Sequence, residues 1–176
     1  QTANLPNISD YVTLPEINLL LAIQTYQEAI HSQSYSYILE SVIPAEKRMK
    51  IYDIAIKDKH LVKRNKVIAD HYEEFIKNHT DKGFVKVMMA NYMLEGIYFF
   101  LGFSFFYNLA RSGKMTGVAT EIKYINRDEF THMAIFQGMF RELQKERQDL
   151  FTNEMKNELR EMMKKAIEEE IEWGKY

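Results

Sequence analysis

The chain has 176 residues, enough for one domain with a substantial core, and its formal net charge is −2. Acidic and basic residues are interspersed without a basic block, so we expect no nucleic-acid partner. The absence of cysteine excludes disulfides, thiolate metal sites and a cysteine nucleophile, and it is consistent with a cytoplasmic location. Seven glycines and three prolines are few, and the polar stretches have helical spacing, so we expect an all-α fold.

The first predicted helix follows an irregular lead-in at residues 1–14. Thr13 and Glu16 flank Pro15 in a capping-box pattern, which predicts a helix start at this point. The helix should end at about Val42, because a proline follows two residues later. Its apolar positions, which we expect in the core, include Leu19, Leu20, Ile23, Tyr26, Ile30 and Ile38.

The rest of the chain also has helical patterning. The further predicted elements are helices at 45–57, 61–78, 84–111, 115–146 and 152–176, with a turn at 78–83. The second and third helices are amphipathic with charged outer faces, and Thr152 is the expected cap of the last one.

The predicted helix at 84–111 is the most apolar stretch, and from Val87 to Ala110 its only charged residue is Glu95. A segment of this length can span a bilayer. Its polar and glycine interruptions, and aromatic residues at its middle rather than its ends, instead favour the centre of a helical bundle, so we expect no membrane partner. A buried carboxylate requires a compensating partner, and the sequence must supply one opposite Glu95.

Two Glu-x-x-His pairs supply candidates for that partner: Glu28 with His31, and Glu129 with His132. Residues three apart lie on one helix face, so each pair presents a carboxylate and an imidazole to the same point. One such pair on a charged helix is usually a coincidence. Two pairs together with Glu95 are the ligand pattern of a carboxylate-bridged dimetal site in a helical bundle, and such ligands suit iron or manganese.

Three segments resemble the small, radical-generating subunit of class I ribonucleotide reductase: EAIHSQSYSY at 28–37, LEGIYFFLGF at 94–103 and INRDEFTHM at 125–133. The resemblance covers nearly the whole chain, including the order and spacing of the segments. It implies a ferritin-like helical bundle with a dimetal-carboxylate core, formed by residues 1–176 as a single domain. The metal ligands that it implies are Glu28, His31, Glu95, Glu129 and His132.

The resemblance also places the stable tyrosyl radical at Tyr35. From the spacing alone, Tyr35 lies one turn beyond His31 on the same stripe of the helix, and the alternative is a core tyrosine with a hydrogen-bonded hydroxyl group. In the family, apolar side chains keep water and reductants from the radical. The matching positions here are Phe99, Phe103 and Ile125, for which ordinary core packing is the alternative.

Asp128 is the candidate for a supporting role beside the metal ligands. It precedes Glu129 and points to a different face, and a metal-bound histidine usually donates its second nitrogen to a carboxylate. The resemblance implies that Asp128 holds His31 and continues a radical-transfer path. The alternative is an exposed aspartate paired with Arg127 or a lysine.

The chain departs from the family pattern at both ends. The family has a sixth ligand, an Asp or Glu about thirty residues upstream of Glu28, and that position falls before Gln1. The radical-path tryptophan also lies upstream, whereas Trp173 is near the opposite end, and the tail that docks the large subunit has no counterpart. We therefore expect the chain to lack N-terminal and C-terminal parts of the full protein.

The resemblance implies a function in deoxyribonucleotide biosynthesis for DNA replication. A dimetal centre, with two iron ions or alternatively manganese, would react with oxygen and oxidise Tyr35. A large catalytic subunit would then receive the radical and reduce ribonucleotides. A homodimer is expected, with a flavoprotein activase as a further partner of a manganese form.

Two other functions remain open at this stage. A ferritin-like di-iron oxygenase or oxidase has almost the same ligand spacing, but it needs a substrate cavity where Tyr35 and the phenylalanines lie. An iron-storage bundle is disfavoured by the aromatic centre and by the lack of acidic entry channels in the sequence.

Overall fold

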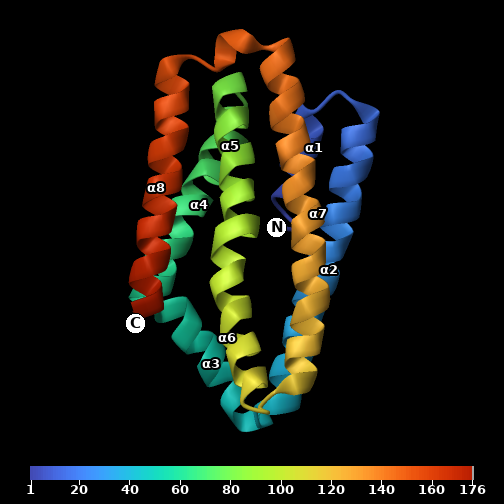
Figure 1. Ribbon diagram of the computed structural model, residues 1–176, viewed down its shortest axis with the longest axis vertical. Coiled ribbons are helices and arrows are strands. Elements are labelled where there is room, and N and C mark those ends of the chain that lie inside the picture. Colours follow the sequence, from blue (N-terminus) through green and yellow to red (C-terminus); the bar gives the residue numbers. More distant parts are fainter. Residues whose placement is uncertain (176) are drawn as a thin grey trace.

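The computed structural model describes residues 1–175, and helices are the only regular secondary structure in this part of the chain, which confirms the all-α prediction. The helices are α1 (Leu5–Tyr11), α2 (Pro15–Val42), α3 (Ala45–Lys57), α4 (Lys59–Lys77), α5 (Asp81–Met93), α6 (Phe99–Arg111), α7 (Thr116–Glu146) and α8 (Asn153–Lys175). A π-helical turn, η1 (Leu94–Tyr98), joins α5 to α6, and a 3-10 turn, η2 (Gln148–Leu150), precedes α8. The long helices lie along a common direction as an elongated bundle (Figure 1).

The span α5–η1–α6 lies at the centre of this bundle, between α8 on one side and α7 on the other (Figure 1). Its residues Asp81–Arg111 are long and apolar enough to cross a membrane by length and composition, but half of the most apolar window is buried inside the bundle. Met88, Met93 and Tyr98 from this span are essentially inaccessible to solvent and belong to the main hydrophobic core. A core helix passes the same length and composition test as a membrane span.

The N-terminal residues differ from the prediction. The predicted lead-in contains the helix α1, whose Leu5 and Ile8 are fully buried in the main core. The capping-box prediction is also wrong, because Leu14 occupies the N-cap position of α2 and no side chain caps this helix. Tertiary packing of two apolar side chains, rather than a local signal, holds α1 in place.

The predicted core face of α2 is wrong as well. Of its predicted core positions only Ile38 is buried, whereas five others are exposed: Leu19, Leu20, Ile23, Tyr26 and Ile30. The face of α2 that packs into the bundle instead carries Leu21, Gln24, Glu28 and His31. Three polar residues thus face inward on this helix, beside Leu21 and Ile38, while five apolar residues face outward.

Two helix boundaries shift because side chains cap them. Asp58 accepts a hydrogen bond from the backbone N–H of Leu61, so α4 starts before the predicted position. Thr80 caps α5 by accepting from the N–H of Gly83, so the predicted turn is shorter than expected. The predicted cap of the last helix is confirmed, since Thr152 accepts from the N–H of Met155.

Candidate metal centre

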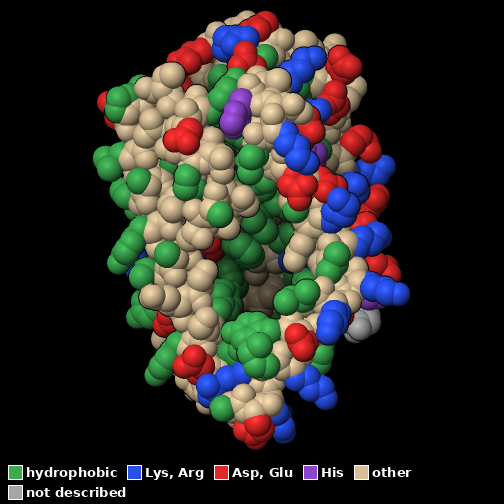
Figure 2. All heavy atoms as spheres, turned by 180° about the vertical axis from the view of Figure 1, so that it is seen from behind, with side chains coloured by type: hydrophobic (Ala, Val, Ile, Leu, Met, Phe, Trp, Pro, Cys, Tyr) green, Lys and Arg blue, Asp and Glu red, His purple; other side chains and the backbone are tan. Residues whose placement is uncertain are grey.

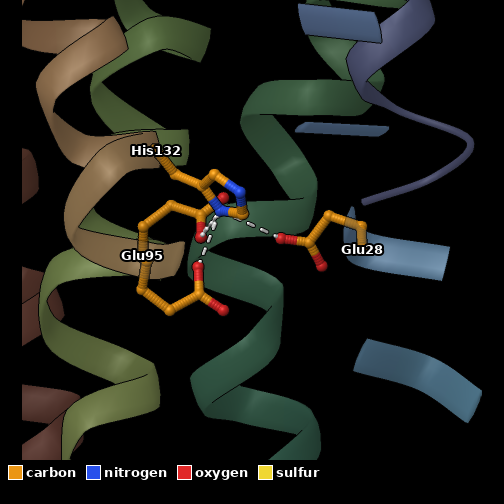
Figure 3. A group of neighbouring side chains, drawn as sticks. Glu28, Glu95 and His132 are labelled. Carbon is orange, nitrogen blue, oxygen red and sulfur yellow. Dashed lines mark hydrogen bonds and ion pairs between the residues drawn. The ribbon is translucent and has the colours of Figure 1, made fainter. Parts of the chain in front are cut away.

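The candidate ligands come from three separate parts of the bundle. Glu28 and His31 lie on α2, Glu95 lies on η1, and Glu129 and His132 lie on α7. All five are buried, and Glu28, Glu95 and His132 point toward one another in the interior (Figure 3). The structure therefore brings together every residue that the sequence predicted as a ligand.

Four of these residues form a compact cluster, since Glu28, Glu95, Glu129 and His132 each offer a ligand atom within 4.8 Å of the others. His132 Nδ1 is at its centre, 2.9 Å from Glu129 Oε2, 3.3 Å from Glu95 Oε2 and 3.5 Å from Glu28 Oε1. His31 lies beside the cluster, with its Nδ1 atom 3.3 Å from Glu129 Oε1. Glu129 thus contacts both histidines, so its carboxylate connects the two Glu-x-x-His pairs.

Each histidine has a polar partner at its second nitrogen. His31 Nε2 lies 3.3 Å from Asp128 Oδ2, and His132 Nε2 lies 3.0 Å from Gln27 Oε1. Asp128 also accepts hydrogen bonds from the guanidinium group of Arg127, so both predicted contacts of Asp128 are present. Such outer partners fix the orientation of the imidazole rings of metal ligands.

Amide side chains around Glu95 were missed by the sequence reasoning. Glu95 Oε1 accepts from the amides of Gln1 at 2.7 Å, Gln24 at 2.9 Å and Asn91 at 3.3 Å. Gln24 precedes Glu28 by four residues and Asn91 precedes Glu95 by four, so helical spacing from the predicted ligands is the signal that would have found these two.

The cluster carries more carboxylates than cations, and its protonation reflects this imbalance. Burial, followed by the charge of Glu129, raises the pKa of Glu28 to about 7. Burial also raises the pKa of Glu95 well above its ordinary value. For Glu129, hydrogen bonds with Glu95 and His132 outweigh burial and lower the pKa to about 2. For His132, hydrogen bonds with Glu129 and Glu95 outweigh burial and raise the pKa to about 10.

The donor atoms fit divalent metal ions. Three buried side-chain atoms at the site make no contact with hydrogen-bond geometry, namely Glu28 Oε1, His31 Nδ1 and Gln24 Oε1. The first two have only the ion-pair contacts given above, with His132 and Glu129. Unpaired buried polar atoms are costly, and metal coordination is one way to satisfy a carboxylate oxygen and an imidazole nitrogen. The protons held by the cluster are those that a metal ion would displace. Oxygen and nitrogen ligands of this kind suit iron and manganese.

Tyr35 lines a hollow beside the ligands. The hollow has a volume of about 470 Å³ and also contacts Glu28, His31, Phe99 and Glu129. Figure 2 shows a hollow on the back of the molecule with hydrophobic side chains on its walls. Tyr35 is 40% exposed, so in this structure the hollow is open to solvent beside the predicted radical.

The predicted apolar surround forms a separate small core. Phe103 and Ile125 are buried together with Ile38 and Ile122, and Phe99 packs against this cluster from a half-buried position. The rings of Phe99 and Phe103 lie 6.2 Å apart. These contacts establish the packing of the three predicted residues, while protection of a radical remains a prediction.

A buried set of three glutamates and two histidines, presented by helices of one bundle, defines the class of dimetal-carboxylate helical proteins. Comparison with known proteins identifies the member of this class. The sequence model of the family "Ribonucleotide reductase, small chain" matches residues 1–176, and the chain belongs to this family.

Individual relatives agree with this membership. The chain is 51% identical to the ribonucleoside-diphosphate reductase subunit beta of Treponema pallidum, covering 100% of this chain and 50% of the relative. It is 39% identical to the subunit of the same name from Halalkalibacterium halodurans, covering 96% of this chain and 49% of that relative. The chain therefore spans about half the length of these curated relatives.

A solved structure shows the same fold. The ribonucleotide reductase R2 subunit from Clostridium botulinum matches with a TM-score of 0.96 and 54% identity, over 99% of this chain and 55% of that chain. The fold is thus the ferritin-like helical bundle of the family, as the resemblance implied.

Proposed function

We propose that this chain is the metal-binding part of a ribonucleotide reductase small subunit, which generates a tyrosyl radical for a large catalytic subunit. The observation that carries the proposal is the buried ligand cluster of Glu28, Glu95, Glu129 and His132, with His31 beside it. The relatives, named as subunits beta of ribonucleoside-diphosphate reductase, support the reaction. The substrates of the whole enzyme would be ribonucleotides, reduced to deoxyribonucleotides on the large subunit.

The proposed cofactor is a pair of iron ions, with manganese as the alternative. Bound between α2, η1 and α7, the pair would supply the oxidising chemistry with oxygen. Glu129 contacts both His31 and His132, so these three side chains would together help to hold the metal pair. Gln24 and Asn91 hold Glu95 in position through its Oε1 atom. Metal analysis of protein from its native host distinguishes iron from manganese.

Tyr35 is the proposed site of the radical. Burial, followed by the charges of Glu129 and Glu28, raises the pKa of its phenol above the ordinary value. The phenol therefore stays protonated at neutral pH, and its oxidation removes one electron together with the hydroxyl proton. Phe99 on the wall of the same hollow limits the access of reductants from that side.

Electron paramagnetic resonance tests this assignment. After addition of iron and oxygen to the full-length protein, we expect a tyrosyl radical signal that disappears in Tyr35→Phe while metal content is unchanged. Tyr37→Phe is the matched control, because Tyr37 lies two residues away on the outside of α2 and is mostly exposed. An unchanged signal in Tyr35→Phe would show that the radical is elsewhere.

The hollow beside Tyr35 keeps a di-iron oxygenase or oxidase as a second candidate. A volume of about 470 Å³ next to the ligands is large enough for a small organic substrate. The two functions differ in their dependence on a partner. Substrate oxidation by the protein alone, without a large subunit, would support the oxygenase, whereas ribonucleotide reduction only in the presence of the large subunit supports the reductase.

We further propose a cytoplasmic homodimer, with a flavoprotein activase as an additional partner if the metal is manganese. Support for the dimer comes from the apolar residues on the outer face of α2, among them Leu19, Ile23 and Tyr26. An exposed apolar stripe of this length is typical of an interface. We expect the double variant Ile23→Asp/Tyr26→Asp to sediment as a monomer, and a wild-type monomer in analytical ultracentrifugation would contradict the dimer.

A further inference from the structure

A second buried cluster of charges lies on the side of η1 formed by α4 and α8. Arg64 on α4 and Glu170 on α8 are each 7% exposed. The guanidinium group binds the carboxylate through two contacts, Nε to Oε2 at 2.5 Å and Nη2 to Oε1 at 3.1 Å. This two-pronged geometry is the strongest form of a carboxylate–arginine pair, and it ties two helices together that are far apart in sequence.

Aromatic rings enclose the same guanidinium group. Its central carbon lies 4.3 Å from the centre of the Tyr98 ring and 4.6 Å from the centre of the Trp173 ring. Tyr98 is the last residue of η1, and Trp173 lies one turn after Glu170 on α8. Stacking on two rings restricts the guanidinium plane, so the direction of its remaining N–H groups is fixed.

One of these N–H groups reaches the backbone of η1. Arg64 Nη2 donates to the carbonyl oxygen of Tyr98 at 2.6 Å, in addition to its contact with Glu170. The same turn carries Glu95 three residues earlier, at zero exposure in the ligand cluster. A π turn departs from the regular α-helical hydrogen-bond pattern, and such turns occur mostly at functional sites. An external hydrogen bond to its last carbonyl restrains this irregular backbone.

The opposite side of η1 is restrained by α7. A Cβ atom at Gly96 would lie 2.7 Å from Met133 Sδ, so the absence of a side chain there allows the backbone of η1 to approach α7 closely. The turn that carries Glu95 is therefore held between Met133 on one side and the Arg64–Glu170 pair on the other.

Stability alone does not account for the charged pair, because well-packed apolar residues at a buried ion pair are often as stable or more stable. We propose that Arg64, oriented by Glu170 and Trp173, is a positioning residue that fixes the π turn and thereby holds Glu95 in the geometry that binds metal. The consequence for metal binding rests on the proposed function, whereas the restraint on η1 does not.

Backbone hydrogen exchange of the metal-free, full-length protein tests the restraint directly. In Arg64→Leu/Glu170→Leu, which removes both charges and leaves no unpaired ion, we expect the amides of η1 to exchange about 10-fold faster relative to those of α5. The matched control is Lys63→Leu/Glu169→Leu, which removes the neighbouring α4–α8 ion pair, 2.9 Å long, whose lysine is mostly exposed. The control should leave exchange in η1 unchanged.

Titration with Co²⁺ alone tests the consequence for the ligands. We expect the Arg64→Leu/Glu170→Leu variant to bind Co²⁺ about 10-fold more weakly and with an altered visible absorption spectrum, as is typical when groups that support metal ligands are removed. Arg64→Lys, which keeps a cation and a donor at this position, should recover part of the affinity. The Lys63→Leu/Glu169→Leu control should bind as the wild type does.

The outcomes separate the two proposals. Unchanged exchange in η1 in both double variants overturns the positioning role, whatever the metal does. Faster exchange with unchanged Co²⁺ affinity and spectrum would restrict Arg64 to a structural role. That result would also overturn the positioning role. A wild-type protein that binds no metal contradicts the proposed function, and the exchange experiment still decides whether Arg64 restrains the turn.

If the apolar double variant does not fold, Arg64→Lys serves for both measurements, and wild-type exchange and affinity in that variant would count against the proposal.

Discussion

The two buried charged clusters on either side of η1 differ in how their positive and negative charges are balanced. The Arg64–Glu170 pair combines one cation with one anion, and its guanidinium group is occupied by a carboxylate, a backbone carbonyl and two aromatic rings. The ligand cluster instead gathers three glutamates around His132 and leaves buried atoms without hydrogen bonds. The charges of the first cluster therefore balance within the chain, although the buried hydroxyl group of Tyr98 has no hydrogen-bond partner there, whereas the second cluster has an excess of carboxylates that fits an external cation.

The largest expected difference concerns metal binding. Glu95→Ala removes a candidate ligand from the cluster around His132, so we expect a loss of Co²⁺ affinity of about 100-fold or more. The metal-free protein should unfold at a lower temperature than the wild type, because the buried amides of Gln24 and Asn91 lose their acceptor. Isothermal titration and thermal unfolding measure the two effects. Metal affinity close to that of the wild type would remove Glu95 from the ligand set.

Changes to the Arg64–Glu170 pair should mainly affect folding stability. Arg64→Met leaves Glu170 buried without a cation, and breaking a buried pair in this way costs about 3–5 kcal/mol of folding free energy. The loss should appear in urea unfolding of the metal-free protein and should be much smaller in the Arg64→Leu/Glu170→Leu variant. Equal destabilisation of the single and double variants would mean that packing, not charge, determines the stability of this region.

A smaller effect is expected from pH. Because the pKa of Glu28 rises from 4.5 in the unfolded chain to about 7 in the folded protein, the folded state binds more protons in this interval. The contribution of Glu28 to the stability of the metal-free protein should therefore be greatest below about pH 4.5. It should decline by up to about 3 kcal/mol as pH rises through 7.

Glu28→Gln is the variant that isolates this contribution, and thermal unfolding between pH 5 and pH 8 measures it. Glu129 does not interfere in this range, since its pKa is lowered to about 2 and its stabilising contribution is lost only below about pH 4.5. Glu95 and His132 also have raised pKa values, so they leave a residual slope of the same sign, and the expected result is a smaller slope in Glu28→Gln than in the wild type. An unchanged slope would assign the pH dependence to these groups.

The clustering of the candidate ligands was predictable from the sequence because their signal is local. Two Glu-x-x-His pairs and one carboxylate in an apolar helix require only helical spacing to be recognised, and the structure brings all five side chains together. The exposed face of α2 was not predictable by the same reasoning. Hydrophobicity places apolar residues inside, but this helix turns Gln24, Glu28 and His31 inward and Leu19 and Ile23 outward.

Other features depend on contacts that no local pattern records. The helix α1 is held by burial of Leu5 and Ile8. The pair of Arg64 and Glu170 joins residues 106 positions apart, on helices whose sequences are typical of charged, solvent-exposed helices. The π turn has no sequence signature of its own, so the predicted helix at 84–111 is confirmed as a helical span, but its local change of hydrogen-bond pattern was not predicted.

The π turn also fixes the length of the central helix. It contains one residue more than a regular α-helical turn, so deletion of a single residue, such as Ile97, would let Asp81–Arg111 continue as an unbroken α-helix. Because the π turn and the α-helical turn that would replace it each complete about one revolution, residues beyond the deletion would keep their faces of the helix, and Phe103 would stay in the small apolar cluster. The change would fall on the turn that carries Glu95, whose backbone would lose its wider hydrogen-bond pattern. The additional residue therefore shapes the backbone at Glu95 and leaves the phenylalanines where a regular helix would place them.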